Sequence, residues 1–211
     1  MSSMPSKEWY CLFDTALGPF GIAWSERGLV RLQLPEADRA ATEKRLGASA
    51  SPCEPPPWAE QVIAAIRRYL AGERVDFAAA AIDLAGVGEF RRAVYESARA
   101  VGWGQTVSYG ELARRIGFPW GARAVGQALA RNPVPLVVPC HRILTQNRRI
   151  GGFSAYAGTL TKQRLLALEG VHVGTPVLPG MAEPPARATT QGLSPRSRCS
   201  DRPPALAGGS G

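Results

Sequence analysis

The first third of the chain alternates short apolar runs with turn residues, a pattern that predicts a small antiparallel sheet. Strand-like runs rich in β-branched and aromatic side chains cover residues 9–14, 20–24 and 29–34. Short stretches containing glycine, one of them with proline, separate the three runs. Because the connections are so short, we expect the runs to pair in sequence order as an antiparallel meander.

Two helical patterns follow the predicted strands. Residues 36–46 and 58–71 carry apolar side chains at helical spacing, and the proline-rich piece Pro52–Pro57 lies between them as a loop. This part of the chain contains no histidine, and its carboxylates are dispersed. We therefore expect residues 1–85 to form an α/β domain, a small antiparallel sheet plus helices, that supports the rest of the protein.

The next part of the chain has a mostly helical pattern. Residues 89–101 repeat apolar side chains at a spacing of four. Ser108 and Glu111 have the spacing of a capping box, in which the serine hydroxyl bonds the glutamate N–H and the carboxylate reaches back. This predicts a helix that starts at Tyr109 and stops at Gly117.

A second short helix is predicted after Phe118–Trp120, with Ala122, Val125 and Leu129 on its apolar face. Two short helices joined by a Gly/Pro turn make a helix-turn-helix candidate. A helical hairpin is also common as plain core architecture, so this pattern alone leaves both interpretations open. Arg123, Gln127 and Arg131 lie off the apolar face, and Gly126 offers a place where a backbone could approach closely.

Charge separates the chain into unlike parts. The formal net charge is +8, but residues 1–89 carry a net of −3 while residues 90–170 carry a net of +9. Such asymmetry is typical of a domain that binds a polyanion, because each Lys or Arg near a phosphate releases a counterion. A solvated basic face without a partner has the same composition. Charge therefore favours DNA binding only when motifs support it.

Other classes of protein are disfavoured by composition. No apolar run reaches the roughly 18 residues that span a bilayer, so we expect no membrane segment. The first residues lack the pattern of a secretory signal, which predicts a cytoplasmic protein, or a nuclear one in a eukaryote. The four cysteines have no metal-finger spacing, so we expect neither metal nor cofactor. Residues 171–211 are rich in proline and glycine, which predicts a disordered tail.

The densest chemistry follows Asn132, where a valine-rich run predicted as a strand leads to Cys140 and His141. A thiolate is the reactive form of cysteine, and neighbouring positive charge favours it. Cysteine beside histidine suggests nucleophilic catalysis. Successive side chains of a strand point to opposite faces, so proton transfer between the two needs a bend or an intervening water. Glu169 is a candidate for orienting the imidazole.

At these residues the sequence resembles the O6-alkylguanine-DNA alkyltransferases, also called methylated-DNA–protein-cysteine methyltransferases. The resemblance covers roughly residues 88–170 closely and the N-terminal part loosely, and the ordered combination of motifs is very specific. The motifs are GQTVSYGEL at 104–112, RAVG at 123–126, NPVP at 132–135, PCHR at 139–142, GGFS at 151–154, and the stretch from Lys162 through Leu165-Leu166 to Glu169-Gly170.

The resemblance implies direct DNA repair, in which the alkyl group of O6-alkylguanine moves irreversibly and stoichiometrically to the protein's own cysteine, with O4-alkylthymine as a further possible substrate class. It implies a monomer acting on double-stranded DNA, and residues 86–170 as the DNA-binding and catalytic domain. The catalytic residues it implies are Cys140 as alkyl acceptor, His141 as base through water, Glu169 as its orienting partner and Asn132 holding the turn behind the site.

The resemblance also implies how the damaged base is reached. Tyr109 helps to rotate the nucleotide and to protonate the leaving guanine, and Arg123 fills the vacated stack. The remaining implied DNA contacts are the small residues Ala124 and Gly126, suited to a minor groove, and Arg131. The implied base pocket consists of Val138, Ile143, Phe153 and Ser154. Phe153 departs from the family, since many members have a tyrosine there.

Three other functions compete with repair. A damage-recognition protein without transfer activity resembles the same motifs but lacks the cysteine, so Cys140 argues against it. A helix-turn-helix regulator normally needs a dimerisation element or a sensing domain, and none is visible in the sequence. A Cys-His hydrolase needs an oxyanion site, for which no motif is found. The sequence therefore favours a single-turnover alkyltransferase.

Overall fold

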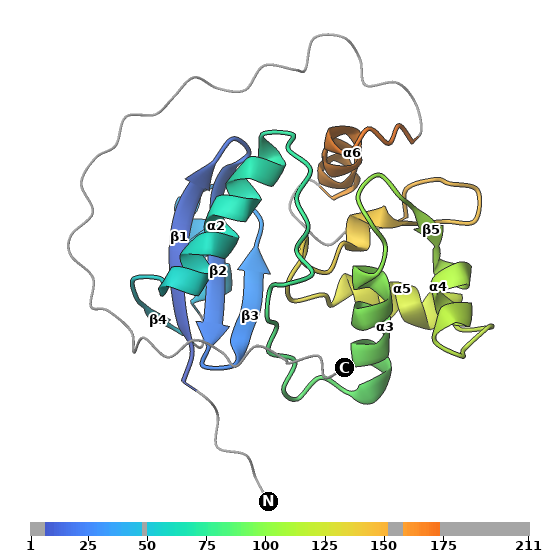
Figure 1. Ribbon diagram of the computed structural model, residues 1–211, viewed down its shortest axis with the longest axis horizontal. Helices are drawn as coiled ribbons and strands as arrows, with labels where there is room; N and C mark the ends of the chain where they lie inside the picture. Colours follow the sequence, from blue (N-terminus) through green and yellow to red (C-terminus); the bar gives the residue numbers. More distant parts are fainter. Residues whose placement is uncertain (1–6, 48–49, 152–157, 174–211) are drawn as a thin grey trace, which may run out of the picture.

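The computed structural model describes residues 7–47, 50–151 and 158–173, so residues 174–211 of the predicted tail lie outside them. The first part is a sheet with one helix on each face (Figure 1). Its strands are β1 (Trp9–Thr15), β2 (Gly18–Ser25), β3 (Gly28–Gln33) and β4 (Ser51–Pro52), in the spatial order β3-β2-β1-β4. The predicted antiparallel meander is confirmed, and the two-residue β4, which pairs parallel to β1, was not predicted.

Helices α1 (Arg39–Leu46) and α2 (Pro57–Leu70) cover the sheet. Both helices were predicted, but α1 starts later than expected because the Asp38 carboxylate caps it by accepting from the Ala41 N–H at 2.7 Å. Successive side chains of β1 point to opposite faces of the sheet, which explains why a helix packs on each face. Tyr10 packs with Leu46 of α1, while the neighbouring positions face the main core under α2.

The second part is mostly helical, as the sequence predicts. Its elements are α3 (Glu89–Arg99), β5 (Val107–Ser108), α4 (Tyr109–Arg115), α5 (Ala122–Ala130), the 3₁₀ turn η1 (Cys140–Arg142), β6 (Ile143–Leu144) and α6 (Thr159–Leu168). Strands β5 and β6 form a parallel pair that the sequence did not indicate. The Ser108 hydroxyl caps α4 as predicted, at 3.0 Å from the Glu111 nitrogen. The Glu111 carboxylate accepts from Arg115 at 2.7 Å.

One continuous apolar core joins the two parts. Trp24 and Ile66 of the first part belong to the same buried cluster as Leu112, Val125 and others of the second. A backbone hydrogen bond of 2.8 Å from the Leu32 N–H to the Pro133 carbonyl ties β3 to the segment that precedes Cys140. Because of this shared core, groups of the N-terminal part lie next to groups of the helical part. Within the ranges that the structure describes, no helix is long and apolar enough to cross a membrane.

Candidate active site

Cys140 lies at the start of the η1 turn rather than at the end of a strand. The predicted valine-rich strand is wrong: an isolated bridge between Pro135 and Val138 is the only pairing in this segment, and Leu136 has a left-handed backbone with φ of 71°. Prolines interrupt the segment repeatedly, and proline has no N–H to donate to a sheet ladder. The chain bends at Pro139 into η1, which supplies the bend that the adjacency of Cys140 and His141 requires.

Asn132 holds this bend from behind. Its Nδ2 donates to the Val138 carbonyl at 2.8 Å, and its Oδ1 accepts from the Val134 N–H at 3.0 Å. Cys140 itself is buried, with 6% of its surface exposed. Burial raises the pKa of the thiol, while the Asn132 side chain and the positive charge of Lys162 lower it. The thiol is therefore held in its neutral form when nothing is bound.

His141 and Glu169 form a buried pair beside the cysteine. The His141 Nε2 lies 2.8 Å from Glu169 Oε1, and both side chains are essentially inaccessible. Burial lowers the pKa of His141, while the hydrogen bond and the charge of Glu169 raise it. Among the described residues, the buried Nδ1 of His141 has no hydrogen-bond partner. A neutral imidazole with Nε2 directed at a carboxylate leaves Nδ1 as the basic nitrogen.

The Glu169 carboxylate is held by several donors. Arg142 donates from Nε to Oε2 at 2.9 Å and from a terminal nitrogen to Oε1 at 2.9 Å. Tyr69, from α2, donates its hydroxyl to Oε1 at 2.7 Å, and the Gly104 N–H reaches Oε2 at 3.2 Å. Burial alone raises the pKa of this carboxyl, but the hydrogen bonds from His141 and Arg142 lower it to about 2. Glu169 is thus a fixed anion.

Lys162 of α6 is a buried cation close enough to Cys140 to affect the pKa of the thiol. Its Nζ donates to the Ile143 carbonyl at 2.6 Å and lies 3.5 Å from the Tyr109 hydroxyl. Burial lowers the pKa of Lys162 to about 8, opposed by the charge of Cys140. A buried ammonium group that is close enough to sense the cysteine stabilises its thiolate.

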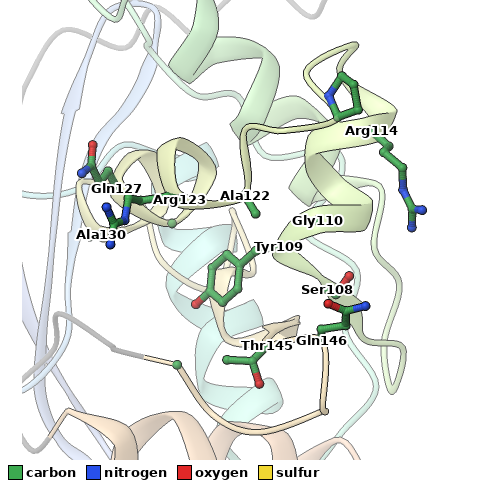
Figure 2. A pocket seen from close by; sticks show the side chains of 13 residues that line it. Ser108, Tyr109, Gly110, Arg114, Ala122, Arg123, Gln127, Ala130, Thr145 and Gln146 are labelled. Atoms are coloured by element: carbon green, nitrogen blue, oxygen red, sulfur yellow. The ribbon is translucent and has the colours of Figure 1, made fainter.

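A groove of about 900 Å³ opens between α4, α5 and the β6 loop. Figure 2 shows Tyr109 at its centre, with Arg123 and Gln127 on one side and Thr145 on the other. Burial raises the pKa of the Tyr109 hydroxyl, and the charge of Cys140 raises it further. Tyr109 therefore lies between the open groove and the thiol. A side chain at Gly151 would come within 2.9 Å of the Tyr109 hydroxyl oxygen, so a larger residue there would displace the Tyr109 side chain.

A second, smaller cavity of about 270 Å³ lies between β3 and the segment around Asn132. Cys140 and Arg131 both line it, together with residues of β3 and the loop that follows. Arg131 thus lies at the end of α5 on the side of the N-terminal part, away from the groove that contains Arg123.

Models of two domains of one protein family match the chain. The domain described as "6-O-methylguanine DNA methyltransferase, DNA binding domain" matches residues 89–171, and "6-O-methylguanine DNA methyltransferase, ribonuclease-like domain" matches residues 9–84. The chain belongs to this family. The residues that gather around Cys140 come from both matched domains, because Tyr69 lies in the first and Glu169 in the second.

Several methylated-DNA–protein-cysteine methyltransferases are similar over nearly their whole length. The protein from Methanosarcina acetivorans is 32% identical over 77% of this chain and 98% of its own. The protein from Mus musculus is 35% identical over 82% and 86%, respectively. The crystal structure of Mycobacterium tuberculosis O6-methylguanine methyltransferase aligns with a TM-score of 0.64, at 31% identity over 77% of this chain and 92% of that one.

Two further relatives bear on DNA. Mycobacterium tuberculosis OGT in complex with DNA aligns with a TM-score of 0.61, at 31% identity over 76% of this chain and 92% of that one. A protein of Thermus thermophilus named "DNA base-flipping protein" is 37% identical over 74% of this chain and 96% of its own.

Most of the predicted site residues lie around Cys140 or along the groove, but some do not. Ala124 is exposed on α5 and does not line the groove. Val138 and Ile143 are fully buried and line neither cavity; their carbonyls serve Asn132 and Lys162. The predicted pocket residues Phe153 and Ser154 lie outside the described residues.

Sequence reasoning missed three residues of the site. Tyr69 lies in the helical pattern at residues 58–71, where a hydroxyl group among apolar positions signals a buried partner. Arg142 belongs to the PCHR motif, and its side chain binds Glu169. Lys162 belongs to the last motif, which implies no role for it, and its side chain is fully buried. A buried charged side chain needs a partner, but the sequence does not say which.

Proposed function

We propose that the protein repairs double-stranded DNA by moving the alkyl group of O6-alkylguanine to the sulfur of Cys140, once per molecule. The observation that carries this proposal is a buried Cys140 beside the His141–Glu169 pair, next to a groove with arginines at its rim. A wholly buried acid–base pair beside a thiol has no structural necessity, because apolar residues of similar volume stabilise a core at least as well.

The groups present account for each step of the transfer. The thiol proton passes through a water molecule to Nδ1 of His141, and Glu169 stabilises the imidazolium that forms. The thiolate sulfur attacks the alkyl carbon, forming the C–S bond while the bond to O6 breaks and its electron pair leaves with the guanine. The Tyr109 hydroxyl, whose pKa burial raises, hydrogen-bonds the departing guanine anion and gives it a proton, which the imidazolium of His141 replaces, so that charge balances.

Burial of Cys140 has a functional consequence. Because burial raises the pKa of the thiol, the free protein keeps it protonated and less reactive toward other electrophiles. Lys162 and Asn132 then favour the thiolate once a proton acceptor is aligned. The site is thus poised for reaction with a base that is placed in it.

The alkyl group of a stacked guanine is out of reach of a buried thiol, so the base must leave the duplex. We propose that α4, the turn at residues 116–121 and α5 act as a helix-turn-helix in the minor groove, with Ala124 and Gly126 allowing close approach. Arg123, exposed at the groove, fills the gap in the stack. Arg131 remains a predicted DNA contact, although it lines the second cavity rather than this groove. Of the predicted base pocket, Val138 and Ile143 contribute through the carbonyls that hold Asn132 and Lys162, while Phe153 and Ser154, outside the described residues, stay predictions.

We propose that the three segments predicted from the sequence have different roles. Residues 1–85 support the site, residues 86–170 bind DNA and carry out the transfer, and residues 171–211 are the predicted tail. The protein acts as a monomer, because one Cys140 and one groove suffice for one lesion.

The decisive experiment is the intact mass of the protein after incubation with a duplex that carries one O6-methylguanine, followed by peptide mapping. We expect a gain of one methyl group on Cys140 that saturates at one per molecule. An unchanged mass with retained DNA binding would overturn the repair function and support damage recognition instead.

A further inference from the structure

We infer that Trp120 extends the DNA-binding surface by packing against the sugar–phosphate backbone beside the groove; this rests on the proposed function. The indole is 97% exposed, which is extreme for the largest apolar side chain. Among the described residues, the only other large hydrophobic residue that is exposed is its neighbour Phe118, at 53%. Large apolar side chains grouped in water mark interaction sites on soluble proteins.

The turn that carries Trp120 is tied down on both sides. The Phe118 N–H donates to the Ala113 carbonyl at 2.9 Å, and the Gly121 N–H donates to the Phe118 carbonyl at 2.8 Å. The Phe118 ring packs edge-on against Phe90, with centroids 5.2 Å apart. A side chain at Gly121 would approach the Phe118 carbonyl to 3.0 Å. Trp120 is therefore presented to solvent by a defined turn.

Position and charge indicate a nucleic acid as the partner. Trp120 follows Pro119, which lines the groove, and precedes by three residues Arg123, which also lines it. Arg114 of α4 adds positive charge on the same hairpin, at the edge of the groove. An indole offers a flat apolar face for a deoxyribose and one N–H donor for a phosphate oxygen, while the arginines attract the polyanion. A protein partner would not need this cationic surround.

The test compares three variants in binding to an undamaged duplex over a range of salt concentrations. We expect Trp120→Ala to bind about tenfold more weakly at every salt concentration, because it removes an aromatic contact but no charge. Trp120→Phe should recover most of the affinity. Arg114→Ala serves as the contrast, since it should lower the salt slope by about one.

The outcomes separate this inference from the proposed function. If the wild type binds and repairs DNA but Trp120→Ala binds equally well, the inference is overturned and the function stands. If Trp120→Ala changes sedimentation of the free protein from oligomer to monomer without affecting DNA binding, the surface serves a second copy and the inference also fails. Absence of DNA binding by the wild type would overturn both.

A second inference rests on a separate observation: we propose that Tyr69, in the N-terminal part, is a positioning residue for the His141 base. Its hydroxyl lies 2.7 Å from Glu169 Oε1 and 3.2 Å from His141 Nε2. The ring is fully buried and packs edge-on against Trp103, with centroids 5.2 Å apart. A hydroxyl group that touches both members of the acid–base pair can fix which nitrogen of the imidazole carries the proton.

The assignment follows from counting hydrogens. Glu169 is ionised and has no hydrogen to give, so the single Tyr69 hydroxyl hydrogen is directed at Oε1. The Tyr69 oxygen then presents only a lone pair to His141 Nε2, and Glu169 Oε1 does the same from 2.8 Å. Nε2 must therefore carry the imidazole hydrogen. Nδ1 is left bare, as a general base requires.

The test uses Tyr69→Phe, which keeps the ring, and Tyr95→Phe as the matched control. Tyr95 is also buried, and its hydroxyl lies 3.0 Å from the Ala128 and Arg131 carbonyls rather than against His141 or Glu169. Both variants lose one buried hydroxyl. We expect only Tyr69→Phe to slow single-turnover methyl transfer at saturating DNA, by about fivefold, the size expected for one hydrogen bond.

The pH dependence distinguishes positioning from a merely structural role. Without the Tyr69 donor, Glu169 becomes more basic and raises the pKa of His141, so the acid limb of the rate profile should move to higher pH. Tyr95→Phe should leave that limb in place. A wild-type rate and pH profile for Tyr69→Phe would overturn the inference.

A measurement on the wild type keeps this inference testable if the variant does not fold or if no transfer occurs. The chain has 2 histidines, so the ring nitrogens of His141 can be assigned by ¹⁵N NMR. We expect a neutral ring protonated on Nε2. A ring protonated on Nδ1 would refute the positioning role of Tyr69 independently of any repair activity.

Discussion

The buried anion Glu169 makes the stability of the protein depend on acid. Its pKa lies at about 2, against an ordinary value of 4.5 that applies in the unfolded chain. Each tenfold difference in proton affinity is worth about 1.4 kcal/mol, so ionised Glu169 stabilises the folded state by about 3 kcal/mol at neutral pH. Because the folded-state pKa is the lower one, this stabilisation is fully present above pH 4.5 and is lost as the pH falls toward 2.

The perturbation that tests this value is Glu169→Gln. The variant removes the charge and leaves the Arg142 guanidinium, whose side chain is only 8% exposed, without its anion. Breaking a buried pair in this way costs about 3–5 kcal/mol. In urea unfolding across pH 2–7, the free energy of unfolding of the variant should therefore lie well below the wild-type value at neutral pH. This difference should narrow by about 3 kcal/mol toward pH 2.

The exposed pair of Glu111 and Arg115 provides the matched control. Their side chains are 42% and 41% exposed, and the two residues lie one helical turn apart on α4. Glu111→Gln should cost no more than about 0.5 kcal/mol at any pH. The burial of His141, which lowers its pKa, also reduces stability below pH 6.5 in the wild type and in Glu169→Gln, and more so in the variant, which lacks the charge that raises this pKa. If the difference in free energy of unfolding between the wild type and Glu169→Gln does not change with pH, the argument is refuted.

Three further predictions concern repair. Cys140→Ser should retain DNA binding and lose methyl transfer, and any methyl acceptance detected by mass would contradict its role as acceptor. Arg123→Ala should slow base extrusion, followed by fluorescence of a base analogue, more than it weakens binding to undamaged DNA; unchanged repair kinetics would count against it. Lys162→Met should raise the pKa of the Cys140 thiol and slow transfer, because it removes the buried cation that favours the thiolate; alkylation of the thiol against pH measures this.

Short-range patterns in the sequence correctly predicted the start of α4 and the antiparallel strands β1, β2 and β3. The Ser108 hydroxyl caps α4 at the predicted residue because capping is decided within one turn of chain. The meander of β1, β2 and β3 follows from short apolar runs separated by turns. The prediction of a strand before Cys140 is wrong. Strand pairing needs a partner edge and free N–H groups, and the proline-rich segment has few free N–H groups.

The sequence by itself determined the chemistry: the order of the motifs around Cys140, His141 and Glu169 placed the chain in its family. The tertiary structure decided which groups act on them. Tyr69 lies 100 residues from the carboxylate that it contacts, and the contact exists only because both matched domains share one core. Burial, likewise, sets the protonation of Cys140 and Lys162. Desolvation and distant partners depend on how the chain packs, which spacing along the sequence does not encode.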